Sequence, residues 1–435
     1  MAMIIKNVDL DGQLTDVRLA DGLIAEIDDN LTGLNMIDGH GGALIPGLHD
    51  HHIHLNGTAA AMNSVRCGPP EVTAAAKLIE VLNKPGSGWL RGVGYHHSVA
   101  GEIDRAWLDE HGPDRPIRIQ HRGGRLWILN SLAMNELELS EPNNGRFYDA
   151  DLHIRKTSSF PDLRPLIQKL LSWGITGVTE VTPSNSIAEF NHYLKNTAPL
   201  RVTVMGKAAL SDLGHNQVGP LKLHYHDHDL PELDNLATEI NAAHNRGRNV
   251  AAHCVTRAEL MLTLAAIEQA GPLAGDRIEH AAIADEAAID WMKKLDMIVV
   301  TQPNFIAERV DAYVEDVEPH DLPHLWRLKS FQDVGLKLAA GSDAPFGDPN
   351  PWKAMAAAVS RPSGFENEAI SPETALALYT KPVNDAGAPA RQIAVGEQAD
   401  ICLLDCNWAD ARRDLAVVNV RATWIGGELV YHLVD

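Results

Sequence analysis

Residues 249–281, NVAAHCVTRAELMLTLAAIEQAGPLAGDRIEHA, hold two strand patterns and a helix start between them. The first apolar run, 250–252, is followed by Thr256 and Glu259, which have the T-x-x-E spacing of a helix capping box. The second run ends at His280. Since two parallel strands need a long crossover, usually a helix, the stretch predicts a strand–helix–strand unit. His253 and His280 then lie at the carboxyl ends of their strands.

The same alternation continues through the middle of the chain. Strand-like apolar runs with helical patterns between several of them lie at 42–48, 174–181, 200–206, 220–225, 296–302 and 336–343. About eight such units in roughly 340 residues favour a closed (β/α)₈ barrel over an open α/β sheet. The runs at 88–95 and 116–120 exceed that count, so we expect an insertion within about residues 85–160.

Both ends of the chain predict antiparallel strands. Asp21-Gly22 and Gly426-Gly427 are dipeptides suited to two-residue hairpin turns, and ADICLLD (399–405) is an apolar strand pattern. Neither end can bury much apolar surface alone. We therefore expect one small β-sandwich domain from residues 1–43 and 386–435, with the barrel in residues 44–385.

The composition excludes several classes of protein. The 435 residues include 37 Lys and Arg but 58 Asp and Glu, a net charge of −21, which disfavours nucleic acid and anionic membranes as partners. The four cysteines are scattered and suggest neither a disulfide framework nor a CxxC metal motif. No signal-peptide pattern or 18-residue apolar run is present, so a cytoplasmic protein without a membrane span is expected.

Three strand ends of the predicted barrel carry metal-ligand side chains. The carboxyl ends of barrel strands surround the site in proteins of this fold. His253, His280 and Asp343 each follow a separate strand, and the last of them lies in LKLAAGSDAP (336–345). The three side chains are therefore expected at the same rim of the barrel.

The stretch LHDHHIHL (48–55) supplies two more candidates. His52 and His54 are two residues apart, so on a strand both face one side, about 7 Å apart, and can converge on one cation at roughly 2.0–2.1 Å each. His49 and His51 have the opposite parity and point away. Asp50 shares the parity of the pair and is interpreted as a polar group that supports it.

Lys222 is a further candidate, in PLKLHYHDHDL (220–230). A lone amine facing the barrel interior is costly unless it is paired or modified. The neighbouring His224, His226 and His228 allow two interpretations, a second metal site or a solvated loop.

In this order, the motifs resemble those of the amidohydrolase superfamily of metal-dependent hydrolases. IPGLHDHHIHL (45–55) corresponds to the P-G-x-x-D-x-H-x-H motif of that family, and AVGEQADICLLD (394–405) to its closing G-x-x-A-D motif. The resemblance covers nearly the whole chain. The segments 114–131, 174–181 and TQPNF (301–305) are similar to the branch that contains the N-substituted formamide deformylases.

The resemblance implies one or two divalent metal ions, and zinc is the metal expected. Lys222 would be an N-carboxylated bridge between two ions, unless the carboxylate of Glu180 replaces it. The implied ligands are His52, His54, Lys222, His253, His280 and Asp343.

The implied reaction is hydrolysis of a non-peptide C–N bond, such as an amide, formamide or carbamate, by metal-activated water. Asp343 would accept the proton of the water and deliver it to the leaving nitrogen. Alternatives on the same scaffold are deamination of an amino-heterocycle and hydrolysis of an ester or lactone. The expected substrate is a small molecule, and whether the chain forms a homo-oligomer is left open. Side chains predicted to contact the substrate are His97, His121, Arg122 and Arg125.

Overall fold

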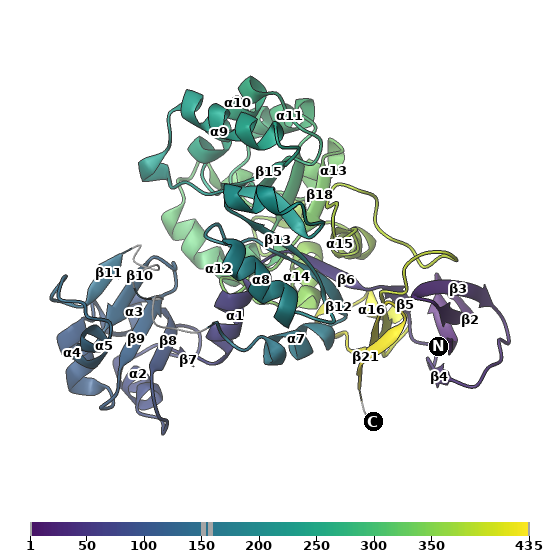
Figure 1. Cartoon of the computed structure of the whole chain (residues 1–435), viewed down its shortest axis with the longest axis horizontal. Coiled ribbons are helices and arrows are strands. Elements are labelled where there is room, and N and C mark those ends of the chain that lie inside the picture. Colours follow the sequence, from purple (N-terminus) through teal and green to yellow (C-terminus); the bar gives the residue numbers. More distant parts are fainter. Residues whose placement is uncertain (1, 149–153, 155–159, 434–435) are drawn as a thin grey trace. The chain divides into compact units, whose positions relative to one another are not determined.

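The computed structural model describes residues 2–148, 154 and 160–433, and the chain divides into two compact units (Figure 1). Unit 1 consists of residues 1–55 and 164–435, and unit 2 of residues 56–163. Unit 1 contains a barrel and a small β sandwich, while unit 2 is built around a sheet of its own.

The barrel in unit 1 is a ring of eight parallel strands, which confirms the predicted fold class. In chain order, which is also their order in the sheet, the strands are β6 (Leu48–Ile53), β12 (Ile175–Glu180), β13 (Arg201–Gly206), β14 (Val218–Leu223), β15 (Val250–Cys254), β16 (Arg277–His280), β17 (Ile298–Thr301) and β18 (Lys337–Ala340). At the carboxyl end of β6 and just after β18, the Asp343 N–H donates to the His52 carbonyl at 2.7 Å, and the His54 N–H to the Ala344 carbonyl at 2.9 Å. These bonds join the first strand to the last.

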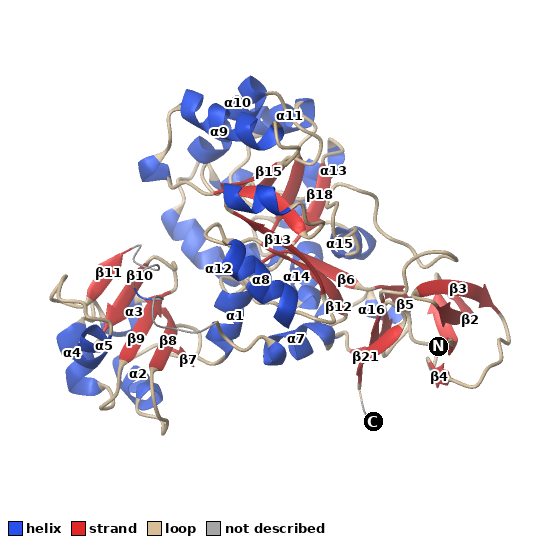
Figure 2. Cartoon of the chain, in the orientation of Figure 1, coloured by secondary structure: helices blue, strands red, loops and turns tan. Residues whose placement is uncertain are grey.

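Helices cover the outside of the barrel, so strands such as β16 and β17 are buried on both faces (Figure 2). Thr256 and Glu259 form the expected capping box, with the Glu259 N–H donating to Thr256 Oγ1 at 3.1 Å and the Thr256 N–H to Glu259 Oε2 at 3.0 Å. The principal helices are α7 (Arg164–Leu171), α8 (Ile187–Asn196), α9 (Leu233–His244), α10 (Arg257–Ala270), α11 (Glu286–Lys294), α12 (Pro303–Asp316), α14 (Pro351–Val359) and α15 (Pro372–Tyr379).

The two ends of the chain form a sandwich of two four-stranded sheets. One sheet has the order β3-β2-β1-β4 and the other β21-β20-β19-β5. Both predicted hairpin dipeptides have positive φ, 52° and 80° at Asp21-Gly22 and 58° and 75° at Gly426-Gly427, as a tight hairpin turn requires. Ile5, Leu403 and Trp424 belong to the core between the sheets. The strands are β1 (Met3–Leu10), β2 (Gln13–Ala20), β3 (Leu23–Asp28), β4 (Met36–Asp38), β5 (Leu44–Pro46), β19 (Ile401–Leu404), β20 (Val420–Ile425) and β21 (Glu428–His432).

The apolar run at 42–48 differs from the sequence expectation. It was expected to open the barrel, but β5 pairs antiparallel with β19 in the sandwich. The barrel strand β6 starts only after Gly47, where a Cβ would lie 2.2 Å from the Thr176 side chain. The chain therefore passes from the sandwich to the barrel within a few residues.

Unit 2 has a five-stranded mixed sheet, in the order β11-β10-β9-β8-β7. The strand-like runs at 88–95 and 116–120 form β8 (Leu90–Tyr95) and β9 (Ile117–His121), which pair in parallel. The other strands are β7 (Val65–Arg66), β10 (Leu126–Leu129) and β11 (Arg146–Tyr148), and the helices include α2 (Ala75–Leu82), α3 (His97–Ala100), α4 (Arg105–His111) and α5 (Ser131–Glu136). In the described part of the chain, no helix has the length and apolarity needed to cross a bilayer.

Candidate metal centre

Five of the predicted ligands lie together at the carboxyl ends of barrel strands. The Nε2 atoms of His52 and His54 are 3.3 and 3.1 Å from Oδ1 of Asp343. The ring centre of His280 is 4.7 Å from that of His52, and the ring centre of His253 is 4.6 Å from that of His280. Ligand atoms of His52, His280 and Asp343 all lie within 4.8 Å of one another, as a group that could hold one metal ion.

Oxygen partners fix the far side of two of these rings. Nδ1 of His52 contacts the Glu279 carboxylate, and Nδ1 of His280 lies 2.6 Å from Oε1 of Gln302. A carboxylate or an amide oxygen only accepts, so each Nδ1 carries the proton and donates it. This leaves the Nε2 lone pair of each ring directed to the centre, the arrangement common to metal-binding histidines.

The atoms that face the centre fit a cation. In the described residues, His280 Nε2 and Asp343 Oδ1 are buried and have no hydrogen-bond partner. The third ring, that of His54, has its Nδ1 2.8 Å from Thr182 Oγ1, so its Nε2 also faces Asp343. Converging lone pairs repel one another unless a positive charge lies between them, and imidazole with carboxylate is a donor set suited to zinc and similar ions.

The backbone at two of these residues is unusual. His280 has φ 72° and Asp343 has φ 53°, both in the left-handed region, which costs of order 1–3 kcal/mol for residues other than glycine. At His280 this conformation allows two consecutive side chains, Glu279 and His280, to reach the same centre. Strict alternation along the strand would have placed them on opposite faces.

Glu279 connects the centre to two buried cations. Its carboxylate contacts the Arg277 guanidinium as well as the His52 ring, and Lys222 Nζ is 3.9 Å away. Burial alone would raise the pKa of Glu279, but Arg277, then Lys222 and His52, hold it well below its ordinary value. Glu279, Gln302 and Thr182 are not among the residues predicted from the sequence, although Glu279 lies in the stretch 249–281 and Gln302 in TQPNF (301–305).

Lys222 is buried near the same centre. Its Nζ has no hydrogen-bond partner in the described residues, and Glu279 is the carboxylate within ion-pair distance. Burial lowers the pKa of this amine, against the attraction of Glu279. The predicted role of Lys222 as a ligand stays a prediction.

Glu180, the predicted alternative to the lysine bridge, accepts hydrogen bonds from the loop that follows β12. Its Oε1 accepts the Thr182 N–H at 2.9 Å and the Asn185 side-chain amide at 3.2 Å, while Oε2 accepts the Leu55 N–H. Three donors of the chain therefore occupy most of the acceptor sites of this buried carboxylate, and its role as a replacement for the lysine bridge stays a prediction.

The other polar residues of the 48–55 stretch support the strand. Asp50 Oδ1 accepts the N–H groups of His52 and Ser342, both at 3.0 Å, and burial raises the Asp50 pKa to about 6. His49 Nε2 contacts Thr179 Oγ1 at 2.9 Å and its ring packs on His51. Burial lowers the pKa of both rings, His49 and His51, well below the ordinary value, so both are neutral.

The histidine cluster after β14 is a chain of ring contacts, with the His224 and His226 ring centres 4.8 Å apart. The ring centre of His224 lies 4.4 Å from that of His253, and burial lowers the His224 pKa to about 3. His226 and His228 stack on each other farther along the loop. Only the first of the three is therefore in ring contact with a predicted ligand.

The predicted substrate residues lie in unit 2. His121 ends β9, the Arg122 N–H donates to the Tyr95 carbonyl at 2.8 Å, and a cavity of about 280 Å³ is lined by His97, His121 and Arg125, among others. Their assignment to substrate binding stays a prediction.

Comparison with known proteins identifies the family. A family model described as "Amidohydrolase family" matches residues 35–154 and 163–431. The chain is 24% identical to an N-substituted formamide deformylase from Arthrobacter pascens, over 97% of this chain and 92% of the relative.

Solved structures share the fold. An uncharacterized metal-dependent hydrolase from Pyrococcus furiosus matches with a TM-score of 0.75 and 20% identity, over 93% of this chain and 99% of the other. A guanine deaminase from C. acetobutylicum, with guanine bound, matches with a TM-score of 0.58 and 13% identity, over 99% and 100%. The chain therefore belongs to the amidohydrolase family and is a metal-dependent hydrolase of carbon–nitrogen bonds other than peptide bonds.

Proposed function

We propose that this amidohydrolase cleaves the C–N bond of a small N-formyl or related N-acyl amine. The observation that carries the proposal is the convergence of imidazole Nε2 atoms on Asp343 Oδ1, at 3.3 Å from His52 and 3.1 Å from His54. Similarity along nearly its whole length to an N-substituted formamide deformylase supports the formamide class.

The ligand set of the proposal is His52, His54, His253, His280 and Asp343, with zinc as the first metal to test. A divalent cation held by these residues lowers the pKa of water towards about 7 and polarises the substrate carbonyl. The chain keeps the donors in place through Glu279, Gln302 and Thr182.

Asp343 is the proposed proton carrier. Its carboxylate accepts a proton from the water whose oxygen bonds to the carbonyl carbon, and it returns that proton to the amine nitrogen as the C–N bond breaks. The products are a carboxylic acid, formate for an N-formyl substrate, and a free amine. The ring of Phe346 lies edge-on to His54 at 5.5 Å and offers an apolar contact for the substituent on nitrogen.

We also propose that Lys222 carries a carboxylate. Its amine adds to CO2 and releases one proton, and the resulting carbamate offers two oxygens as ligands. Support comes from the burial of Nζ and its lack of a hydrogen-bond partner in the described residues. Arg277 offsets the charge of the neighbouring Glu279. A ¹³C carbamate NMR signal from labelled bicarbonate, absent in Lys222→Met, would support the modification, and equal spectra would refute it.

The function is tested with metal-reconstituted protein and a panel of N-formyl amines, N-acyl amines, carbamates and amino-heterocycles. Formate release from N-formyl amines, lost in Asp343→Asn, is the expected result. Ammonia release from an amino-heterocycle, with no hydrolysis of the acyl compounds, would replace the proposal by deamination.

A further inference from the structure

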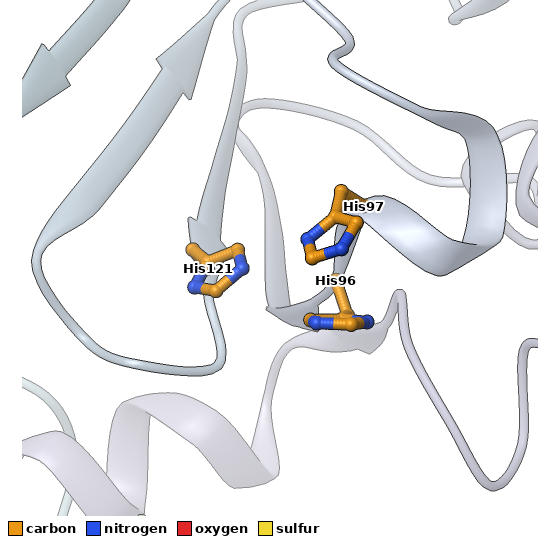
Figure 3. Close-up of side chains that lie close together, drawn as sticks. All are labelled: His96, His97 and His121. Atoms are coloured by element: carbon orange, nitrogen blue, oxygen red, sulfur yellow. The ribbon is translucent and has the colours of Figure 1, made fainter. Parts of the chain in front are cut away.

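Unit 2 contains a second group of metal-ligand side chains, separate from those of the barrel site. His96, His97 and His121 each offer a ring nitrogen, and these three atoms lie within 4.8 Å of one another (Figure 3). We call this group the histidine triad.

The local fold explains why the three rings meet. β8 and β9 are parallel neighbours, with Tyr95 opposite His121, so the residues at their carboxyl ends lie side by side. His96 has extended backbone and is the N-cap of α3, while His97 is its first residue. This change of backbone direction brings two consecutive rings together, with centres 4.0 Å apart and the His96 ring 5.7 Å from that of His121.

The triad is a set of imidazoles without a carboxylate. Neutral imidazole is a common ligand of zinc. Zinc–nitrogen bonds of about 2.0–2.1 Å require nitrogens roughly 3.4 Å apart in a tetrahedral site. Small rotations of the side chains would bring the rings from their present spacing to that distance, and His97 is exposed and not packed in a core.

Hydrogen bonds to the far side of two rings set the strength of such a site. His96 Nδ1 accepts the Ser98 N–H at 3.3 Å and lies 2.8 Å from Ser98 Oγ, so its Nε2 carries the ring proton in this arrangement, and the backbone contact must open before Nε2 can bind a cation. His121 Nδ1 accepts the Gly123 N–H at 3.1 Å, and that contact must open before Nε2 can bind. The two-glycine turn at Gly123 and Gly124 permits this movement at a cost, so weaker binding than at the barrel centre is expected.

From this geometry we propose that unit 2 binds one transition-metal ion of the zinc type through His96, His97 and His121. His97 and His121 also line the cavity of about 280 Å³ in this unit. Three imidazoles would leave one position of a tetrahedral ion free, as in zinc sites that accept a water or a ligand. The proposal is independent of the reaction assigned to the barrel.

The test is a count of bound zinc. The full chain is stripped with a chelator and dialysed against a fixed low concentration of free Zn²⁺, and zinc per chain is measured by atomic emission. Variants His97→Ala and His121→Ala should each hold one equivalent less than the wild type. His111→Ala is the matched control, because His111 lies in the same unit and its ring stacks on Trp107. It should hold as much zinc as the wild type.

A second set of variants distinguishes zinc bound by the histidine triad from zinc bound at the barrel centre. In the double variant His52→Ala/His54→Ala, which disables the barrel centre, the zinc that remains should disappear when His121→Ala is added. Circular dichroism establishes that each variant is folded. Equal zinc content in the wild type, His97→Ala and His121→Ala would overturn the proposal, whether or not the barrel centre binds metal.

Discussion

Replacing Glu279 by glutamine tests whether this buried carboxylate, which is not among the predicted ligands, orients His52 in the candidate metal centre of the barrel. Glu279 is completely buried and contacts three groups, the ring of His52, the guanidinium of Arg277 and, at 3.9 Å, the amine of Lys222. Glutamine keeps the shape and one acceptor oxygen but removes the charge. The variant therefore measures how much the charge alone contributes to zinc affinity and to the free energy of unfolding.

Two magnitudes follow from these contacts. Removing one member of a buried ion pair costs about 3–5 kcal/mol of the free energy of unfolding, because the remaining charges stay buried, here Arg277 and Lys222. Removing the partner of a metal-binding histidine lowers metal affinity about 10–100-fold. Since the amide oxygen of the introduced glutamine would still accept the His52 Nδ1 proton, we expect the lower figure, about tenfold, or about 1.4 kcal/mol.

The assay measures zinc affinity by competition with a chelator, and stability of the metal-free chain by urea unfolding. Glu368→Gln is the matched control. Glu368 is also buried and accepts from Arg327 at 3.2 Å and from the N–H groups of Leu328 and Ser330 at 2.9 Å. Both variants should be less stable than the wild type, but only Glu279→Gln should lose zinc affinity.

Two results would refute the reasoning. If Glu279→Gln binds zinc as tightly as the wild type, the carboxylate stabilises the barrel without orienting His52. Loss of affinity to the same extent in both variants would equally contradict it, because the effect would then follow stability and not the contact with the ring.

Three further changes test other parts of the chain. Asp343→Asn should abolish turnover but retain most of the metal, because an amide cannot accept the proton of the attacking water; full activity at normal metal content would end the assignment. Gly341→Ala should lower both the metal content and the melting temperature. The added Cβ would lie 2.4 Å from the backbone nitrogen of His52 and 2.6 Å from the Cβ of His52, too close for either to stay in place. For Asp16, burial alone would raise the pKa, but the Lys6 ammonium and two backbone N–H donors lower it, so its contribution is present above about pH 4 and lost as pH falls through the lowered pKa. The urea midpoints of Asp16→Asn and the wild type should therefore differ at about pH 7, and the difference should shrink progressively as the pH falls below about 4; a difference that stays constant would contradict this.

The barrel was predictable because its strands are buried on both faces. β16 and β17 are buried at every residue and appear in the sequence as short apolar runs with helices after them. The signal does not distinguish one sheet from another. The apolar run at 42–48 was expected in the barrel but contains β5 of the sandwich, and in unit 2 β8 and β9 also pair in parallel, although β9 (IRIQH) alternates apolar and polar residues. Apolarity predicts a buried strand and does not indicate which sheet contains it.

The partners of the site residues were less predictable than the residues themselves. His52, His54, His253, His280 and Asp343 follow from motifs at strand ends. The role of Glu279 does not, because alternation along a strand places Glu279 and His280 on opposite faces. The positive φ of His280 removes that alternation, and nothing in the four letters RIEH indicates it.

Closure of the barrel and assembly of the centre depend on the same few residues. The bonds that join the first strand to the last are donated by the Asp343 N–H to the His52 carbonyl and by the His54 N–H to the Ala344 carbonyl. The same backbone geometry places the side chains of His52, His54 and Asp343 in contact. The left-handed backbone at Asp343 is strained by itself, so the closing bonds hold it in the conformation that the centre needs. A metal ion that binds these side chains must therefore stabilise the seam between β6 and β18. Hydrogen exchange of the Asp343 and His54 amides should slow when zinc is added, and unchanged exchange at both would show that the seam forms independently of the metal.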